Sequence, residues 1–379
     1  MNTTIKATSH ARGPRVTISR LAAASVIAAV ASLTSALAQP RFSITVLPTP
    51  AGFDESIPSQ INDQGYVAGY SASASGGYWG VATIWKNGVP TVLGRLKDGT
   101  YSSASAINSK GVAVGDGDDG DGRPLGWVSS SGKVVNFFSN NGGNTHPISI
   151  NDAGIIGGYY VKGFSSPWRG AIWTVDAKDP RKSTKFDLPL LPGSDPLKDS
   201  YISWSFNKLG QATGYGSSAS FGQHAVLWNN DASHSIVDLG VFGYDWSSLA
   251  YSINDLGQVV GESHPPFGSR PVLWHNDPAH TAFELPLLPG DNYGSAQLIN
   301  NEGTMIGSSA YGEPGTWNVT PSRTVIWIDG QVYEFQSLLD ASAAGWIVGA
   351  PISLNNKGQM TTTGSYNGVN HALILNPIN

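Results

Sequence analysis

The pattern that decides the fold is Ile253-Asn254-Asp255-Leu256-Gly257-Gln258-Val259-Val260-Gly261. Its Asn and first Gly, three residues apart, recur at Asn62/Gly65, Asn108/Gly111, Asn151/Gly154, Asn207/Gly210, Asn300/Gly303 and Asn355/Gly358. A second Gly follows four residues later in six of the seven copies, whereas the last copy has Thr362 at that position. Neighbouring copies begin 43 to 56 residues apart. This interval predicts a repeat protein in which each copy is one structural unit.

Each repeat predicts four short strands. Asn-x-x-Gly between two apolar stretches is typical of a hairpin loop, because Asn bonds its own backbone and Gly accepts a positive φ. A third strand follows and ends in Trp in six copies: Trp85, Trp127, Trp173, Trp228, Trp274 and Trp327. A polar turn then leads to a fourth strand such as Val237-Asp238-Leu239-Gly240.

Four antiparallel strands in about 45 residues is the size of a propeller blade. We therefore expect an all-β chain folded as one β-propeller of seven four-stranded blades; six or eight blades are the alternatives. The last copy supplies only three strands before the chain ends, and residues 41–48 resemble a fourth strand. The N-terminal strand is therefore expected to complete the C-terminal blade and to cover its sheet edge.

The repeat core, the strand His224-Ala225-Val226-Leu227-Trp228 and the segment Asp238-Leu239-Gly240 together resemble the bacterial extracellular HAF-repeat family. The family is named for a His-Ala-Phe tripeptide; in this chain Arg replaces the His in four copies and no copy has the Phe. The resemblance covers nearly all of residues 41–379. It implies export and a propeller-like repeat fold, and it implies no established activity.

The first 38 residues are expected to be a signal peptide, followed by the repeat domain at residues 39–379. They carry four basic residues and no acid, then an apolar run, and end in the small-x-small cleavage site Ala36-Leu37-Ala38. A membrane-spanning helix is the less favoured alternative, because the run is rich in Ala and Ser. Removing these residues from the 22 basic and 27 acidic ones leaves 18 against 27. This acidic balance disfavours nucleic acids and anionic membranes as partners, and we expect no stable membrane insertion after cleavage. Periplasmic and extracellular locations both remain open.

The irregular connections are expected to gather at one end of the ring. In an antiparallel blade, the second-to-third loops and the blade-to-blade connections share an end, opposite the uniform Asn-x-x-Gly turns. Aromatic rings beside carboxylates suit sugar recognition through stacking and hydroxyl contacts. The candidate ligand-binding residues are Trp79, Trp168, Tyr201, Trp246, Tyr293, Trp346, Asp245 and Asp291. The competing interpretation gives these acids turn roles and these aromatics packing roles.

Two other sets of polar residues need an interpretation. Arg123, Arg169, His224, Arg270, Arg323 and His371 begin equivalent third strands, which favours a repeated structural role over catalysis. Four carboxylates lie within six residues, at Asp116, Asp118, Asp119 and Asp121. Hard oxygen ligands in this density could hold Ca²⁺, although the spacing is not that of an EF-hand. A solvated acidic loop is the alternative, and no other cofactor is implied.

The function predicted from sequence is that of an exported binding module, with a glycan or a protein as ligand. The alternative is a polysaccharide hydrolase or lyase acting at the propeller mouth. Binding is favoured because repeat symmetry accounts for most polar residues, and neither a nucleophile elbow nor a Ser/His/acid set stands out in the sequence.

Overall fold

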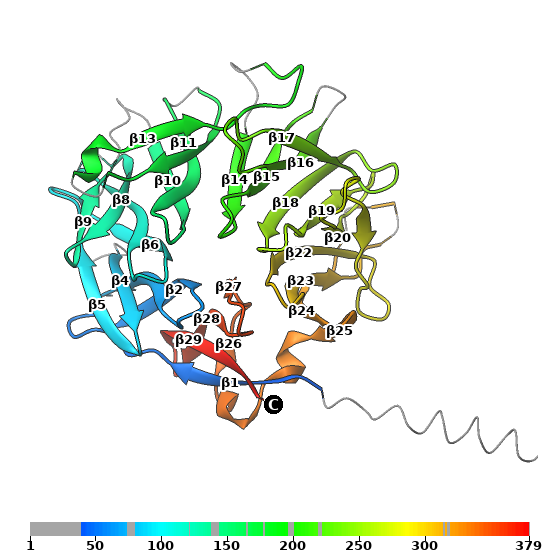
Figure 1. The fold of residues 1–379 in the computed structure, drawn as a ribbon. Coiled ribbons are helices and arrows are strands. Elements are labelled where there is room, and N and C mark those ends of the chain that lie inside the picture. The colour runs from blue at the N-terminus through cyan, green and yellow to red at the C-terminus, as the bar shows by residue number, and fades with distance from the viewer. Residues whose placement is uncertain are drawn as a thin grey trace, which may run out of the picture. The chain divides into compact units, whose positions relative to one another are not determined.

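The structure is a computed structural model that describes residues 39–73, 80–120, 122–137, 144–163, 166–176, 179–195, 201–218, 222–313, 315–316 and 319–378, without the side chains of residues 181 and 202–204. The expected signal peptide lies outside these ranges. Residues 41–378 form seven antiparallel sheets arranged as blades of a ring (Figure 1). This confirms the predicted all-β, seven-bladed propeller. No helix in the described ranges is long and apolar enough to span a membrane.

Six blades follow the predicted order, with each strand pairing with the next. Blade 1 contains β2 (Glu55–Ile61), β3 (Val67–Ala72), β4 (Val81–Lys86) and β5 (Val89–Gly94). Blade 2 contains β6 (Ser102–Ile107), β7 (Ala113–Asp118), β8 (Pro124–Ser130) and β9 (Lys133–Asn136). Blade 3 contains β10 (Asn144–Ile150), β11 (Ile155–Val161), β12 (Arg169–Thr174) and β13 (Thr184–Asp187), with the short 3₁₀ helix η2 (Pro180–Lys182) before β13.

The second half of the ring repeats this arrangement. Blade 4 contains β14 (Tyr201–Phe206), β15 (Ala212–Ser217), β16 (Gln223–Trp228) and β17 (Ile236–Gly240). Blade 5 contains β18 (Ser247–Ile253), β19 (Val259–His264), β20 (Arg270–Trp274) and β21 (Ala282–Glu284). Blade 6 contains β22 (Tyr293–Ile299), β23 (Met305–Ala310), β24 (Arg323–Ile328) and β25 (Gln331–Glu334), followed by the 3₁₀ helices η3 (Phe335–Leu338) and η4 (Ala341–Ala343).

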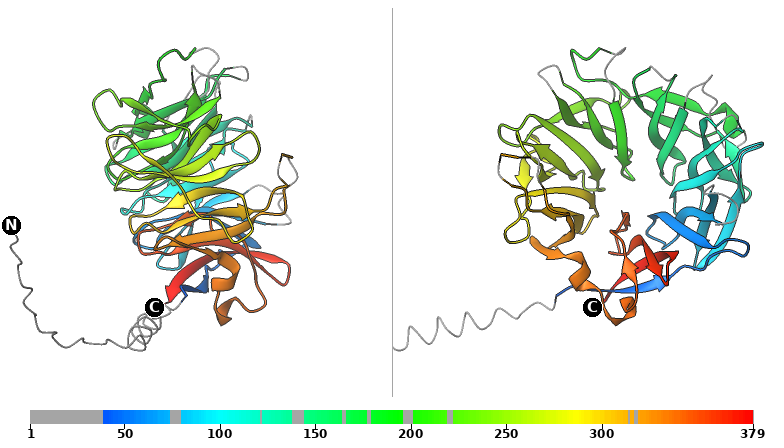
Figure 2. Two further views of the ribbon diagram at one scale, coloured as in Figure 1. Left: turned by 90° about the vertical axis from the view of Figure 1, so that its right-hand side faces the viewer. Right: turned by 180° about the vertical axis from the view of Figure 1, so that it is seen from behind.

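The two ends of the chain close the ring in blade 7. This blade combines β26 (Ile347–Val348), β27 (Ser353–Leu354), β28 (Met360–Tyr366) and β29 (Val369–Ile378) with β1 (Arg41–Val46). β1 pairs antiparallel with β29, in a register that runs from Arg41 opposite Ile378 to Val46 opposite Leu373 (Figure 2). The predicted completion of the last blade by the N-terminal strand is therefore confirmed.

The repeated Trp residues pack the blades. All six are at most 1% exposed. Trp274 of blade 5, for example, shares a core cluster with Ala225 and Leu227 of blade 4. The indole N–H groups of Trp85, Trp228 and Trp327 also donate to the carbonyls of Pro48, Pro189 and Pro286 at 2.6–2.8 Å. The hydrophobic core is thus a series of layers between neighbouring blades.

The repeated Asn residues fasten each blade to the next. Within its own turn, Asn254 Oδ1 accepts from the backbone N–H groups of Leu256 and Gln258, as the sequence predicts. Its Nδ2 also donates to the carbonyl of Asn300, the equivalent residue of the next blade. The same bond links Asn62 to Asn108, Asn108 to Asn151, Asn207 to Asn254, Asn300 to Asn355 and Asn355 to Asn62, at 2.8–3.1 Å. Among the described residues, the junction from Asn151 to Asn207 lacks it.

The second Gly of the repeat faces a bulge in the innermost strand. In blade 5, the pairing of β18 with β19 shifts between Ala250 and Ser252. A Cβ on Gly261 would lie 1.9 Å from the carbonyl oxygen of Leu249, so no larger residue fits. Blade 7 escapes this limit because its inner strand is divided into β26 and β27. Thr362 occupies the Gly position there and donates its hydroxyl to the carbonyl of Ala350 at 2.9 Å.

Candidate functional site

The predicted ligand-binding residues fall into separate environments. Tyr201 is fully buried, and its hydroxyl contacts the Leu191 N–H at 3.1 Å and the Ser217 carbonyl at 2.5 Å. Its backbone N–H donates to the carbonyl of Trp168. Tyr201 therefore has a packing role in this structure, while Trp168 beside it is half-buried.

Three of the predicted residues gather at the boundary of blades 5 and 6. Asp291 and Tyr293 line an open pocket there together with Arg270. Arg270 Nε lies 3.6 Å from the carboxylate of Asp245, and Arg323 donates to Asp291 at 2.8 Å. The side chains of Asp245 and Asp291 are only 7% and 6% exposed, so both carboxylates serve mainly as partners of arginines.

The remaining aromatic candidates lie apart from this boundary pocket. Trp246 is 65% exposed on the connection into blade 5, two residues after the exposed Tyr244. Trp346 packs against Tyr366 and His371 of blade 7, with ring centroids 5.0 and 5.4 Å away. Trp79 lies outside the described residues.

The cations that begin the third strands make repeated structural contacts. Arg270 pairs with Glu284 at 3.2 Å, and Arg323 pairs with Glu334 at 3.3 Å, so each arginine reaches the fourth strand of its own blade. His224 Nδ1 lies 3.0 Å from Asp238 in the same arrangement. These cross-strand contacts, in three of the six copies, agree with a structural role for the series.

The acidic loop of blade 2 has protein partners for each described carboxylate. Asp118 is fully buried and accepts bonds from Thr100 N at 2.6 Å, Thr100 Oγ1 at 3.0 Å and Tyr101 N at 2.9 Å. Asp119 lies 3.7 Å from Arg123, and Asp121 lies outside the described residues. Within the described ranges, no group of three or more His, Cys, Asp or Glu side chains could hold a metal. Calcium binding stays a prediction.

A different set of side chains forms two groups in blades 2 to 5. These are Tyr101, Asp116, His146, Tyr159, Trp168, Tyr215, Tyr251, Glu262 and His264, here called the aromatic–acid cluster. All nine are half-buried and come from blades 2 to 5. The second strand of each blade starts at the Asn-x-x-Gly turn and ends at the second-to-third loop. Asp116, Tyr159 and Glu262 lie in the later part of these strands, so the cluster is on the side of the ring that carries the irregular loops.

The first half of the cluster surrounds Asp116. Tyr101 donates its hydroxyl to Asp116 at 3.3 Å. His146 packs against Tyr159 and Trp168, with ring centroids 5.1 and 5.7 Å away, and Tyr159 meets Trp168 edge to face at 5.3 Å. Burial raises the pKa of Asp116, against the opposing attraction of His146. Burial likewise lowers the pKa of His146, which Asp116 acts to raise.

The second half surrounds Glu262. Tyr251 donates its hydroxyl to Glu262 at 2.7 Å, and His264 Nε2 lies 3.1 Å from the same carboxylate. The other ring nitrogen of His264 lies 2.9 Å from Ser247 Oγ. Burial raises the pKa of Tyr251, and the neighbouring Glu262 carboxylate raises it further.

Tyr215 of blade 4 is near both halves. After burial and the neighbouring carboxylates of Asp116 and Glu262, its proximity makes a smaller contribution to the raised pKa of Tyr159 and of Tyr251. The cluster thus combines aromatic faces, hydroxyl donors and two carboxylates, and perturbed pKa values of this kind concentrate at functional sites.

Sequence analysis missed most of this cluster, although the sequence contains a signal for it. The residue directly after the second Gly position is Tyr70, Asp116, Tyr159, Tyr215, Glu262, Ser308 and Thr363 in blades 1 to 7. This position changes its chemistry around the ring, while the residue before it is Gly in six of the seven copies. Such variation within a constant framework marks a position that is free to take part in function.

Comparisons with known proteins agree with the fold. No family model and no curated protein matches the sequence. One similar structure is a prolyl endopeptidase, with 12% identity and a TM-score of 0.50 over 85% of this chain and 46% of that one. Another is the β-propeller domain of the Trilobed protease from Pyrococcus furiosus, with 11% identity and a TM-score of 0.49 over 84% of this chain and 95% of that one. Trypanosoma rangeli sialidase gives 11% identity and a TM-score of 0.38 over 85% and 55%. At these identities the likeness concerns the propeller fold alone.

Proposed function

We propose that this chain is an exported carbohydrate-binding propeller whose ligand lies against the aromatic–acid cluster. The observation that carries the proposal is the grouping of Trp168, Tyr159 and His146 beside the carboxylate of Asp116. Sugar rings have apolar C–H faces that stack on flat aromatic groups, and hydroxyl groups that donate to carboxylates. Tyr101 already places one hydroxyl against Asp116, in the way a sugar hydroxyl would bind.

A polysaccharide hydrolase or lyase is the second candidate, and one observation favours it. Glu262 lies between two proton carriers, Tyr251 and His264, and such groups can act in acid–base catalysis. The test is to incubate the mature protein with polymeric glycans and to measure new reducing ends or unsaturated products. Turnover by the wild-type protein that disappears in Glu262→Gln would establish this candidate. If the wild-type protein shows no turnover, binding remains the proposed function.

The binding proposal is tested on a glycan array followed by titration of the best ligand. Trp168→Ala should weaken binding by about tenfold or more, because truncating a central aromatic anchor typically removes ~2 kcal/mol. Asp116→Asn should also weaken binding, because the amide presents only one acceptor oxygen. Trp246→Ala is the matched control, since this exposed Trp lies outside the cluster. Loss of binding in Trp246→Ala with full binding in Trp168→Ala would place the site on the connection into blade 5 instead.

A further inference from the structure

The Asn-turn end of the ring contains a cavity, separate from the aromatic–acid cluster. Its volume is about 430 Å³, and residues from all seven blades line it. This volume lies in the range of small-molecule sites. A feature shared by every blade sits on the propeller axis, so one small ligand there would touch the whole ring.

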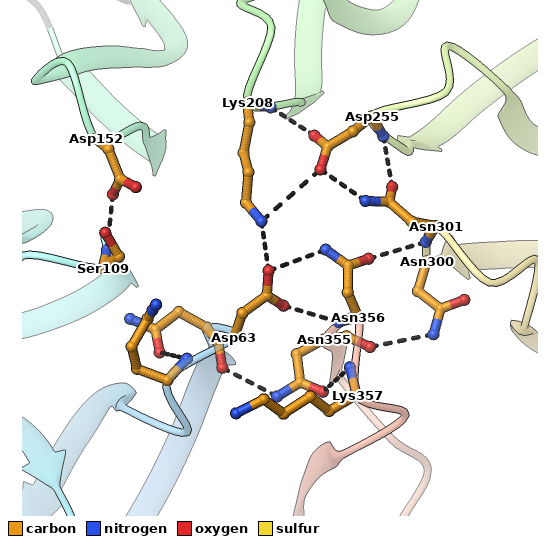
Figure 3. Close-up of polar contacts among 12 residues, drawn as sticks. Asp63, Ser109, Asp152, Lys208, Asp255, Asn300, Asn301, Asn355, Asn356 and Lys357 are labelled. Atoms are coloured by element: carbon orange, nitrogen blue, oxygen red, sulfur yellow. Dashed lines mark hydrogen bonds and ion pairs between the residues drawn. The ribbon is translucent and has the colours of Figure 1, made fainter.

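The residue after each repeat Asn forms the rim of this cavity. These residues are Asp63, Ser109, Asp152, Lys208, Asp255, Asn301 and Asn356 (Figure 3). Several rim side chains accept the backbone N–H of the preceding blade's rim residue, for example Asn356 N to Asp63 Oδ1 and Lys208 N to Asp255 Oδ1, both at 2.8 Å. Their side-chain positions are thus fixed by the closure of the ring.

Lys208 reaches across the mouth of the cavity. Its ammonium group comes from blade 4, donates to Asp63 of blade 1 and lies 3.8 Å from Asp255 of blade 5 (Figure 3). Desolvation acts to lower the pKa of Lys208, but the bond to Asp63 and the attraction of Asp63, Asp255 and Asp152 together outweigh it, so the pKa is raised. A primary ammonium is therefore the group that the rim already accommodates, held by carboxylates of two blades that are not neighbours in the ring.

The interior beneath the rim combines polar and apolar side chains. Ile148, Leu298 and Ile352 contribute to its lining and keep exposed apolar surface. The hydroxyls of Ser252 and Ser353 accept the backbone N–H groups of Ile299 and Ile61 in the next blades, at 3.4 and 3.1 Å. Among the seven residues that follow the repeat Asn, three carboxylates face one ammonium, so these side chains together carry a negative charge.

We propose that this cavity binds a small aliphatic amine. The alkyl chain packs against Ile148, Leu298 and Ile352, and the ammonium takes the place between Asp63 and Asp255 that the Lys208 ammonium reaches. The Lys208 ammonium then competes with the ligand amine for the carboxylates of Asp63 and Asp255, and the ligand binds only when it displaces Lys208. The site is independent of carbohydrate binding at the cluster.

The test uses 1,5-diaminopentane and n-butylamine as probes in calorimetric titrations of the mature protein. Both should bind the wild-type protein. Lys208→Met keeps the chain length without the charge, and it should tighten binding by about tenfold or more because the tethered competitor is gone. Adding Asp63→Asn to Lys208→Met should remove this gain. Lys110→Met is the matched control, because Lys110 bonds the main-chain oxygen of Asp152 at the exposed rim. It should bind like wild type.

The neutral analogue 1-butanol separates charge recognition from apolar filling. The proposal predicts that butanol binds at least tenfold more weakly than n-butylamine. Equal binding of the two probes would overturn it, as would a Lys208→Met protein that binds neither amine. Lys208 is more than half exposed, so this variant should fold, and circular dichroism with a parallel Lys208→Gln variant checks that it has.

Discussion

Replacing Asn254 by Asp should loosen the junction between blades 5 and 6. The side chain is 3% exposed and makes four hydrogen bonds. The carboxylate keeps the two acceptor bonds from Leu256 N and Gln258 N within the turn. It loses the donor bonds to the Asn300 carbonyl at 3.0 Å and to Gln258 Oε1 at 2.8 Å. The second carboxylate oxygen also faces the carbonyl oxygen of Asn300 and Oε1 of Gln258, so electrostatic repulsion replaces the hydrogen bonds.

The expected loss follows from these two bonds. A buried hydrogen-bonding group left without a partner costs about 1–3 kcal/mol, so losing two donors should cost about 2–4 kcal/mol. For a domain of this size this lowers the melting temperature by about 3–6 °C. The penalty should shrink in acid, because burial raises the pKa of the new carboxyl and its protonated form can again donate to Asn300.

Asn151→Asp is the matched control. Asn151 Oδ1 accepts from Ala153 N and Ile155 N, both at 3.0 Å, and within the described ranges its Nδ2 makes no bond to the next blade. Thermal unfolding followed by circular dichroism should show a loss of about 2 °C or less for this variant. Equal losses in the two variants would refute the conclusion that the Asn ring fastens neighbouring blades.

Three further predictions concern closure, charge and metal. Deleting residues 41–48 removes β1 and exposes the edge of β29, so the melting temperature should fall by about 10 °C or more, or the protein should aggregate; unchanged melting would contradict closure by the N-terminal strand. Burial acts to raise the pKa of Asp63, but the bonds that it accepts from Lys208 and Asn356 lower the pKa overall. The stability that the Asp63 carboxylate contributes is therefore fully present above about pH 3.9, the ordinary pKa of Asp in an unfolded chain, and is lost as the pH falls through the lowered pKa of the folded protein. Wild type should therefore melt above Asp63→Asn at pH 7, with the difference vanishing in strong acid; a constant difference across this range would exclude the charge as its source. Millimolar Ca²⁺ should raise the melting temperature of wild type but not of Asp118→Asn/Asp119→Asn, and an unchanged wild-type melting curve would remove the calcium prediction.

The fold could be predicted because its determinants recur locally. The Asn-x-x-Gly turns, the terminal Trp of six third strands and the complementary first and last strands are each visible within a few residues. The Asn254–Asn300 bond and the bulge facing Gly261 were not predictable in the same way. Both depend on backbone atoms that approach only after neighbouring strands or blades have packed.

The candidate site was harder to predict because the sequence does not show which way a loop side chain points. Tyr201 and Trp168 both looked like loop aromatics, yet Tyr201 is buried beneath its loop while Trp168 packs with His146 and Tyr159. Asp245 and Asp291 lie close to third-strand arginines of blades 5 and 6, which are 25 and 32 residues away in sequence. Glu262 and Tyr251 went unnoticed because each sits inside a repeat strand, where a structural role is the natural first interpretation.

The most direct measurement is a crystal structure of the mature protein with the glycan that binds most tightly on the array. The proposed function predicts a sugar ring stacked on Trp168, with a hydroxyl donating to Asp116. A glycan bound at Trp246 or Trp346, with the aromatic–acid cluster empty, would contradict it.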